Sequence, residues 1–249
     1  AERDLGSREK RFKRKMRIIY NIFFLVFSVF YVPYLIFKNK FHKDFFQKLG
    51  NLPEEVIESK KPIWIHAVSV GESVLAVKLI KEIKRRSLDL EIVVSTTTQT
   101  GYDLLNKNVT NLVNGIFYYP LDFSFIVSKV IKLVDPMMYV LIETELWPNL
   151  LEEFKRKKIP VILVNGRISD NSFKNYKRIK FITKKLLSCI NVFCVQTNKD
   201  AERIGFLGGE VKNVKILGNI KFDETLPNAL ENDIRKECGF SPNDKIIVA

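Results

Sequence analysis

The chain has 249 residues and a formal net charge of +13, a length that suits one large α/β domain with or without a tail. Hydrophobic residues make up 46% and charged residues 28%, with only 11 glycines and 9 prolines, which excludes collagen-like, linker-like and fully disordered chains. Three cysteines without a CxxC pair and two isolated histidines argue against a disulfide framework and a zinc site. A reducing compartment and metal-free chemistry are therefore expected.

The positive charge is concentrated at the N-terminus. Residues 1–48 hold 12 Lys/Arg against 4 Asp/Glu, and the basic run from Arg8 to Arg17 is followed by 20 residues without a charge, Ile18 to Phe37. As a helix this stretch would measure about 30 Å, the thickness of a bilayer's hydrocarbon core. The pattern predicts that residues 1–40 form a basic tail and a membrane-anchor helix.

Two alternatives to a straight membrane span stay open. A cleaved signal peptide shares the basic flank and apolar core, but no small-residue cleavage site precedes Lys38. Pro33 interrupts the helix, and lysines make the second flank basic as well, so the positive-inside rule gives only a weak orientation. A segment that dips into one leaflet, with both ends on the cytoplasmic side, fits the two basic flanks better than a span does.

Residues 41–61 mix charges with Gly50 and Pro53 and are predicted to connect the anchor to the main domain, residues 62–222. There, short apolar runs alternate with stretches of helical periodicity such as Ser73 to Arg86, which predicts a doubly wound, parallel α/β sheet. The expected strands are Ile63 to Val70, Glu91 to Thr97, Gly115 to Tyr119, Met138 to Ile142, Val161 to Asn165, Val192 to Gln196 and Val214 to Leu217.

Two later segments carry further expectations. A single helix is predicted from Phe173 to Leu187, with an apolar stripe at Phe173, Tyr176, Ile179 and Leu186 and a lysine-rich opposite face that either faces water or attracts anionic lipid. Residues 223–249 end in the apolar run Lys245 to Ala249 and are predicted to be a linker and the first strand of a second, C-terminal domain.

Ligands of open α/β sheets bind at the carboxyl ends of the strands, which directs attention to Glu72. It follows Ser69-Val70-Gly71 and opens a helix, whose N-terminus stabilises an ionised carboxylate ready to accept a proton. A Glu at a helix start without chemical importance is the competing interpretation. After the second strand, the hydroxyls of Thr97 and Thr98 are suited either to binding a sugar or an anion, or to capping the next helix.

More charged side chains follow the fourth and fifth strands. Glu143 and Glu145, at a spacing of two, would point in opposite directions on a strand, so we expect one to face the cleft and the other the scaffold. Arg167 supplies a guanidinium at the same edge, suited to a carboxylate or a phosphate. No GxGxxG, GxxxxGK[ST], GxSxG or DxD motif is present, so no cofactor or nucleotide site is expected in these residues.

Six blocks in this order strongly resemble the N-terminal half of the 3-deoxy-D-manno-octulosonic acid (Kdo) transferases: Trp64 to Glu72, Thr96 to Gly101, Tyr119 to Asp122, Glu143 to Asn149, Asn165 to Ser169 and Gly218 to Asp223. The resemblance implies the acceptor-binding, Rossmann-like N-terminal domain of a membrane-associated inverting glycosyltransferase of the GT-B architecture. It further implies Kdo transfer from CMP-Kdo to a lipid A precursor in lipopolysaccharide biosynthesis, at the cytoplasmic face of a Gram-negative inner membrane. The C-terminal domain would hold most of the CMP site.

The same resemblance assigns expected roles to individual residues. Glu72 falls on the family's general base and would take the proton from an acceptor hydroxyl. Gln99 is a departure, because family members commonly have Pro there. The remaining substrate-binding positions implied are Ser69, Gly71, Thr97, Thr98, Glu143, Glu145, Arg167, Asn219 and Lys221, the last two near the second domain.

Two other classes of function remain as alternatives. A non-catalytic, basic, membrane-tethered binding module would also explain the anchor and its charge, and a GT-B enzyme with a different donor would share the architecture. Nucleic acid is not an expected partner, because most of the excess charge lies beside the apolar segment, where lipid headgroups are nearer.

Overall fold

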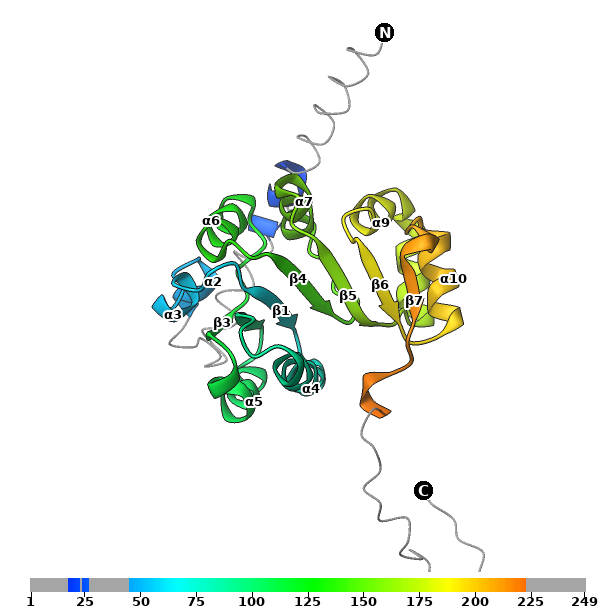
Figure 1. Cartoon of the computed structure of the whole chain (residues 1–249). Helices are drawn as coiled ribbons and strands as arrows, with labels where there is room; N and C mark the ends of the chain where they lie inside the picture. The colour runs from blue at the N-terminus through cyan, green and yellow to red at the C-terminus, as the bar shows by residue number, and fades with distance from the viewer. Residues whose placement is uncertain (1–17, 23, 27–44, 223–249) are drawn as a thin grey trace, which may run out of the picture. The chain divides into compact units, whose positions relative to one another are not determined.

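The computed structural model describes residues 18–22, 24–26 and 45–222, and Figure 1 shows their arrangement. The chain divides into two compact units, residues 1–218 and residues 219–249. The first unit contains a seven-stranded sheet in the order β3-β2-β1-β4-β5-β6-β7, in which every neighbouring pair is parallel. The strands are β1 Ile63–Ala67, β2 Ile92–Thr96, β3 Gly115–Tyr118, β4 Met138–Ile142, β5 Val161–Gly166, β6 Val192–Val195 and β7 Val214–Ile216.

All seven predicted strands are present, and the Rossmann-like, doubly wound fold class is confirmed. The chain moves outward from β1 to β3, returns to β4 beside β1, and then moves outward again to β7. Because parallel crossovers are right-handed, this reversal places the helices of the two halves on opposite faces of the sheet. Figure 1 shows α4 and α5 on one face, and α6 and α7 on the other.

The helices connect the strands, and most begin where a strand has just ended. They are α2 Phe45–Lys48, α3 Glu54–Ile57, α4 Val70–Arg86, α5 Gln99–Val109, α6 Ser124–Val134, α7 Pro148–Lys157, α8 Asp170–Arg178, α9 Lys180–Leu187 and α10 Asn198–Leu207, with short 3₁₀ turns at Thr110–Leu112, Val211–Asn213 and Ile220–Phe222. Strand β1 ends at Ala67 rather than at the predicted Val70, because Ser69 already caps α4.

The single helix predicted from Phe173 to Leu187 is wrong. The chain bends at Ile179, whose backbone (φ −112°, ψ 33°) is not helical, and forms α8 and α9 instead. Helix α8 has no buried residue, whereas α9 buries Thr183, Leu186 and Leu187. The Thr183 hydroxyl donates to the carbonyl oxygens of Tyr176 and Ile179 at the bend. The bend therefore turns the apolar residues of α9 onto the core, while Ile179, part of the predicted stripe, is 49% exposed.

The core is centred on Trp64 in β1, which is completely buried. Its ring lies 5.4 Å from Phe117, 5.3 Å from Tyr139 and 5.7 Å from Phe154, so one aromatic side chain joins three neighbouring elements. Its indole N–H donates to Ser95 Oγ at 2.7 Å, which satisfies the polar atom inside the core. Central strands β1 and β2 are buried on both faces, as predicted, but β6 alternates between buried and partly exposed residues.

The predicted connecting segment, residues 41–61, contains two short helices that cover the edge strand β3. The side-chain carbonyl of Gln47 in α2 accepts the N–H of Tyr118 in β3 at 2.9 Å. In α3, Val56 lies so close to Gly115 that a Cβ on the glycine would approach its side chain to 2.4 Å. The segment thus protects an exposed sheet edge.

The described part of the predicted anchor is helical at residues 18–22 and 24–26. Over the described ranges, the structure contains no helix with the length and apolar character needed to span a bilayer. The other residues of the predicted anchor, and the predicted second-domain strand, lie outside the described residues. The two compact units meet at Gly218 and Asn219, four residues before the predicted boundary, and the predicted domain limits remain predictions.

Candidate active site

The turn between β1 and α4 places Glu72 at the carboxyl edge of the sheet. Ser69 caps the helix by accepting the Glu72 N–H at 3.3 Å. The Glu72 carboxylate folds back over the same turn, where it accepts the Val68 N–H at 2.7 Å and the Ser69 hydroxyl at 2.9 Å. Only 7% of Glu72 is exposed. The helix start therefore holds this carboxylate in one orientation.

Burial raises the pKa of Glu72 above its usual value, and the nearby charge of Glu143 acts in the same direction. The hydrogen bonds from Val68 and Ser69 oppose the change but do not cancel it. A carboxyl group with a raised pKa is better matched to accepting a proton near neutral pH than an exposed one. The geometry is compatible with the predicted role as a base, which itself remains a prediction.

Glu143 and Glu145 lie in the same pocket, so the prediction that one faces the cleft and the other the scaffold is wrong. Strand β4 ends at Ile142, and Glu143 has a left-handed backbone conformation with φ 60°. The alternation of a strand therefore no longer applies beyond Ile142. Burial raises the pKa of Glu145, and the charges of Glu72 and Glu143 raise it further. The three carboxylates thus form one acidic group.

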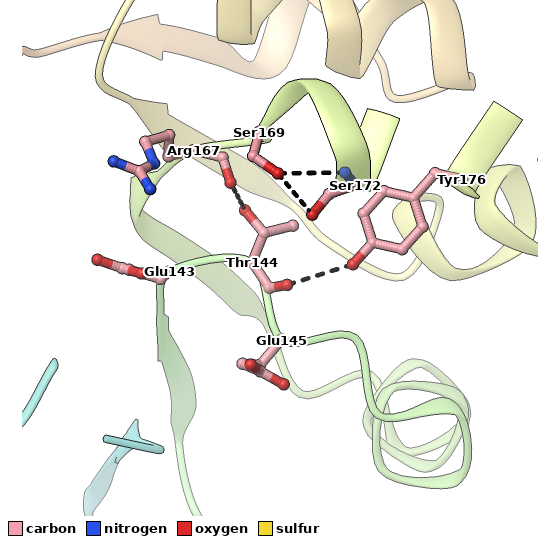
Figure 2. Close-up of a pocket in the computed structure, with 7 residues that line it drawn as sticks. All are labelled: Glu143, Thr144, Glu145, Arg167, Ser169, Ser172 and Tyr176. Atoms are coloured by element: carbon pink, nitrogen blue, oxygen red, sulfur yellow. Dashed lines mark hydrogen bonds between the residues drawn. The ribbon is translucent and has the colours of Figure 1, made fainter. Parts of the chain in front are cut away.

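The pocket at this edge has a volume of about 180 Å³ and is shown in Figure 2. Its lining residues come from the loops after β4 and β5 and from α8: Glu143, Thr144, Glu145, Arg167, Ser169, Ser172 and Tyr176. The Thr144 hydroxyl donates to the Arg167 carbonyl at 2.9 Å and fastens the two loops together. In Figure 2 the Glu143 carboxylate and the Arg167 guanidinium extend on the side away from Tyr176.

Arg167 brings a cation to this acidic group. It follows Asn165, whose φ of 56° accompanies the irregular end of β5. Arg167 is exposed, and within residues 45–222 no carboxylate pairs with its guanidinium. A guanidinium beside hydroxyls and carboxylates can bind a phosphate or carboxylate of a ligand, while the carboxylates accept hydrogen bonds from sugar hydroxyls.

The two predicted threonines have structural roles that are visible in the fold. Thr98 caps α5 by accepting the Gly101 N–H at 3.1 Å, and the Thr97 hydroxyl donates to the Val68 carbonyl at 2.8 Å. Thr97 therefore supports the turn that carries Glu72. Substrate binding by either residue is untested. Gln99, at the position where the resemblance leads one to expect Pro, accepts the Tyr118 hydroxyl at 2.6 Å.

The other predicted site residues are less constrained. Gly71 is exposed in the first turn of α4, where an added Cβ would meet only Ser69 Oγ, at 3.9 Å. Asn219 and Lys221 belong to the second unit, where the Asn219 side chain accepts the Lys221 N–H at 3.0 Å. The described ranges contain no group of three or more His, Cys, Asp or Glu arranged to hold a metal ion.

Four pocket residues were not predicted as site residues: Thr144, Ser169, Ser172 and Tyr176. Ser169 and Ser172 stand at the start of α8, where Ser169 Oγ accepts the Ser172 N–H at 3.1 Å, and the Tyr176 hydroxyl donates to the Thr144 carbonyl at 3.5 Å. Ser169 could have been predicted from the sequence, because the run Asn165 to Ser169 follows a strand whose carboxyl end lies at the ligand-binding edge of the sheet. Tyr176 belongs to the predicted apolar stripe, a pattern that gives no sign that its hydroxyl lies in the pocket.

Comparison with known proteins finds similarity to a family, to individual sequences and to solved folds. Residues 43–224 match the family described as 3-Deoxy-D-manno-octulosonic-acid transferase (kdotransferase). The chain is 35% identical over 88% of its length to a bifunctional glycosyltransferase/methyltransferase of Fusobacterium nucleatum, of which it covers 33%. It is 33% identical over 80% of its length to a 3-deoxy-D-manno-octulosonic acid transferase of Rickettsia felis, of which it covers 42%.

The chain therefore spans about a third to a half of the curated relatives that it matches. A crystal structure of a Listeria monocytogenes protein described as a UDP-N-acetylglucosamine 2-epimerase is similar, with a TM-score of 0.50, 10% identity, and coverage of 65% of this chain and 45% of that one. At this identity the likeness concerns the fold alone.

Proposed function

The chain belongs to the 3-deoxy-D-manno-octulosonic-acid transferase family, and from this premise we propose that it forms the acceptor-binding half of an inverting glycosyltransferase. The protein containing it would transfer Kdo from CMP-Kdo to a lipid A precursor during lipopolysaccharide biosynthesis. It would work at the cytoplasmic face of a Gram-negative inner membrane, with a C-terminal domain that forms most of the CMP-binding site. The observation that carries the proposal is the convergence of three carboxylates and one exposed guanidinium at the carboxyl edge of the sheet.

In this proposal Glu72 is the general base. An acceptor sugar hydroxyl gives its proton to the Glu72 carboxylate while its oxygen attacks the anomeric carbon of Kdo, and the bond to CMP breaks. The Val68 N–H and Ser69 hydroxyl hold the carboxylate in place before the reaction, which removes an ordering cost. Burial raises its pKa, which improves its match to the proton that it accepts.

The neighbouring groups are proposed to bind the acceptor. Arg167 would hold an acidic group of the phosphorylated sugar, since its guanidinium is exposed and pairs with no carboxylate of residues 45–222. Glu143 and Glu145 would accept hydrogen bonds from sugar hydroxyls. The charge of Glu143 also adds to the effect of burial in raising the pKa of Glu72.

The test uses the full-length protein and measures Kdo transfer from CMP-Kdo to a lipid A precursor. Glu72→Gln keeps the size of the side chain but removes the base, so we expect the rate of transfer to fall by about 10²- to 10⁴-fold. Glu82→Gln is the matched control, because Glu82 lies on the same helix and pairs with Arg85 and Arg86 at the surface. Its transfer rate should stay unchanged.

A circular dichroism spectrum and an unfolding temperature confirm that each variant is folded. If Glu72→Gln transferred Kdo near the wild-type rate, Glu72 would not be the base, and the same substitution at Glu145 would be examined next. A wild-type protein that bound the acceptor but transferred no sugar from CMP-Kdo would instead support the binding module or a different donor.

A further inference from the structure

Lys48, the last residue of α2, is a cation that the proposed mechanism does not use. Its ammonium group donates to the Thr97 carbonyl oxygen at 3.3 Å and lies 5.4 Å from the centre of the Tyr118 ring. Thr97 directly follows β2, so the ammonium group reaches the carboxyl edge of the sheet. The side chain is partly buried there. Lys48 therefore brings a second positive charge to the edge that carries Glu72 and Arg167.

The charge of Lys48 is not balanced by the fold. Within residues 45–222, no Asp or Glu pairs with its ammonium group. Burial lowers the pKa of Lys48, and no neighbouring carboxylate opposes that change. An ammonium group has three N–H donors, and the Thr97 carbonyl uses only one of them. A partly buried cation of this kind is stabilised when a ligand brings an anionic group to it.

A short series of contacts joins Lys48 to the candidate base. Thr97, whose carbonyl accepts from Lys48, donates its hydroxyl to the Val68 carbonyl at 2.8 Å. The Val68 N–H in turn donates to Glu72 Oε2 at 2.7 Å. Only two residues therefore separate the ammonium group from the Glu72 carboxylate. An anionic group held by Lys48 would lie beside the turn that carries the base.

Lys48 and Arg167 lie on opposite sides of Glu72. In the sheet, β2 is next to β1, β1 is next to β4, and β4 is next to β5. Lys48 reaches the end of β2, Glu72 follows β1, and Arg167 follows β5. Neighbouring strands are about 4.8 Å apart, so three steps separate the ends of β2 and β5 by about 14 Å. The carboxylate of Glu72 therefore has a cation on each side.

We propose that Lys48 binds an anionic group of the acceptor, so that two such groups hold the acceptor, one on Lys48 and one on Arg167. The acceptor would then lie across the ends of β2, β1, β4 and β5, with a hydroxyl facing Glu72. A ligand with a single anionic group meets only one of the two cations, so the pair selects acceptors with two anionic groups about 14 Å apart. The inference rests on the acceptor-binding role proposed above, but not on which sugar is transferred.

The first experiment measures the binding of three soluble probes to the full-length protein by calorimetry: a disaccharide with a phosphate on each sugar, and the two disaccharides that keep only one of these phosphates. Lys48→Gln removes the charge but keeps an N–H donor. We expect it to weaken binding of the doubly phosphorylated probe at least about tenfold, because a hydrogen bond to a charged group is lost. It should weaken only one of the two singly phosphorylated probes. An equal loss for all three probes, or no loss for any, would overturn the proposal.

Three variants serve as controls for this measurement. Lys107→Gln removes an exposed lysine from the last turn of α5, away from the carboxyl edge, and should bind all three probes like the wild type. Lys48→Arg keeps the charge and should bind the doubly phosphorylated probe more tightly than Lys48→Gln does; equally weak binding would overturn the proposal. If Lys48→Gln does not fold, Lys48→Met replaces it, because its aliphatic stem still covers the Tyr118 ring.

The second experiment identifies the source of the anionic group. CMP-Kdo carries a phosphate and a carboxylate of its own, so the KM values for donor and acceptor are measured separately in the transfer reaction. We expect Lys48→Gln to raise the KM for the acceptor and to leave the KM for CMP-Kdo unchanged. A raised KM for CMP-Kdo alone would assign Lys48 to the donor and would overturn the proposal. The calorimetric measurement contains no CMP-Kdo, so a failure of Kdo transfer would leave its result unaffected.

Discussion

Two buried tyrosines offer a direct test of the hydrogen-bond assignment in the core. Tyr139 is 1% exposed, and its hydroxyl has no hydrogen-bond partner among the residues that the structure describes. Tyr118 is fully buried, and its hydroxyl donates to Gln99 at 2.6 Å. Replacement by Phe keeps both rings, including the stacking of Tyr139 on Phe154 at 4.5 Å. The same substitution therefore removes only a hydroxyl at each site, unpaired in one case and paired in the other.

The expected effects have opposite signs. An unpaired buried polar group costs about 1–3 kcal/mol, so Tyr139→Phe should raise the free energy of unfolding by at least about 1 kcal/mol. A typical hydrogen bond contributes about 0.5–1.5 kcal/mol, so Tyr118→Phe should lower the free energy of unfolding by about that amount. For a domain of this size, each kcal/mol shifts the unfolding temperature by about 2–4 °C.

Urea unfolding followed by circular dichroism measures both changes, with thermal unfolding as a second method. Destabilisation of Tyr139→Phe by about 1 kcal/mol or more would refute the reasoning, because it would show that the hydroxyl has a partner, such as a buried water. Three atoms on neighbouring rings are also buried without a hydrogen-bond partner in the described part of the chain: His66 Nε2, Tyr119 Oη and Trp147 Nε1. The result for Tyr139 therefore bears on all four groups.

Two further predictions concern the start of α5 and the cap of α7. Gly101→Ala should destabilise the protein by about 1–3 kcal/mol in urea unfolding, because the new Cβ would lie 2.6 Å from Thr96 Oγ1 and 2.9 Å from Ser73 Oγ. Gly71→Ala, with no atom closer than 3.9 Å, is the control and should be neutral or stabilising; equal losses at both glycines would contradict the steric argument. Burial raises the pKa of Asp122 from 3.8 to about 7, so the folded state binds the proton more tightly than the unfolded state. Relative to Asp122→Asn, the wild type should therefore lose up to about 1.4 kcal/mol of stability per pH unit as the pH rises from 3.8 to about 7. If the stability difference between the two proteins did not change with pH, the groups that donate to Asp122 (the Tyr20 hydroxyl and the N–H groups of Asn149 and Leu150) would keep it ionised.

Local sequence patterns were enough to predict the sheet and the edge where the site lies. The runs Ile63 to Ala67 and Ile92 to Thr96 are apolar enough to be buried on both faces, and such strands need helices on both sides. Parallel strands align their carboxyl ends, so Glu72, Glu143 and Arg167 had to lie at one edge whatever the details of packing. The position of Glu72 at a helix start follows from Ser69, a residue with a strong capping preference.

The tertiary structure decided the features that depend on where a regular element stops or on a distant partner. Strand alternation predicted opposite directions for Glu143 and Glu145, but the strand ends at Ile142 and the left-handed Glu143 brings both into one pocket. No periodicity shows that Asn21 binds Asn149, because partners 128 residues apart leave no local pattern in the sequence. Hydrophobic periodicity reports which face of an element is buried, whereas loop conformation and the pairing of polar groups depend on neighbours that only the folded chain provides.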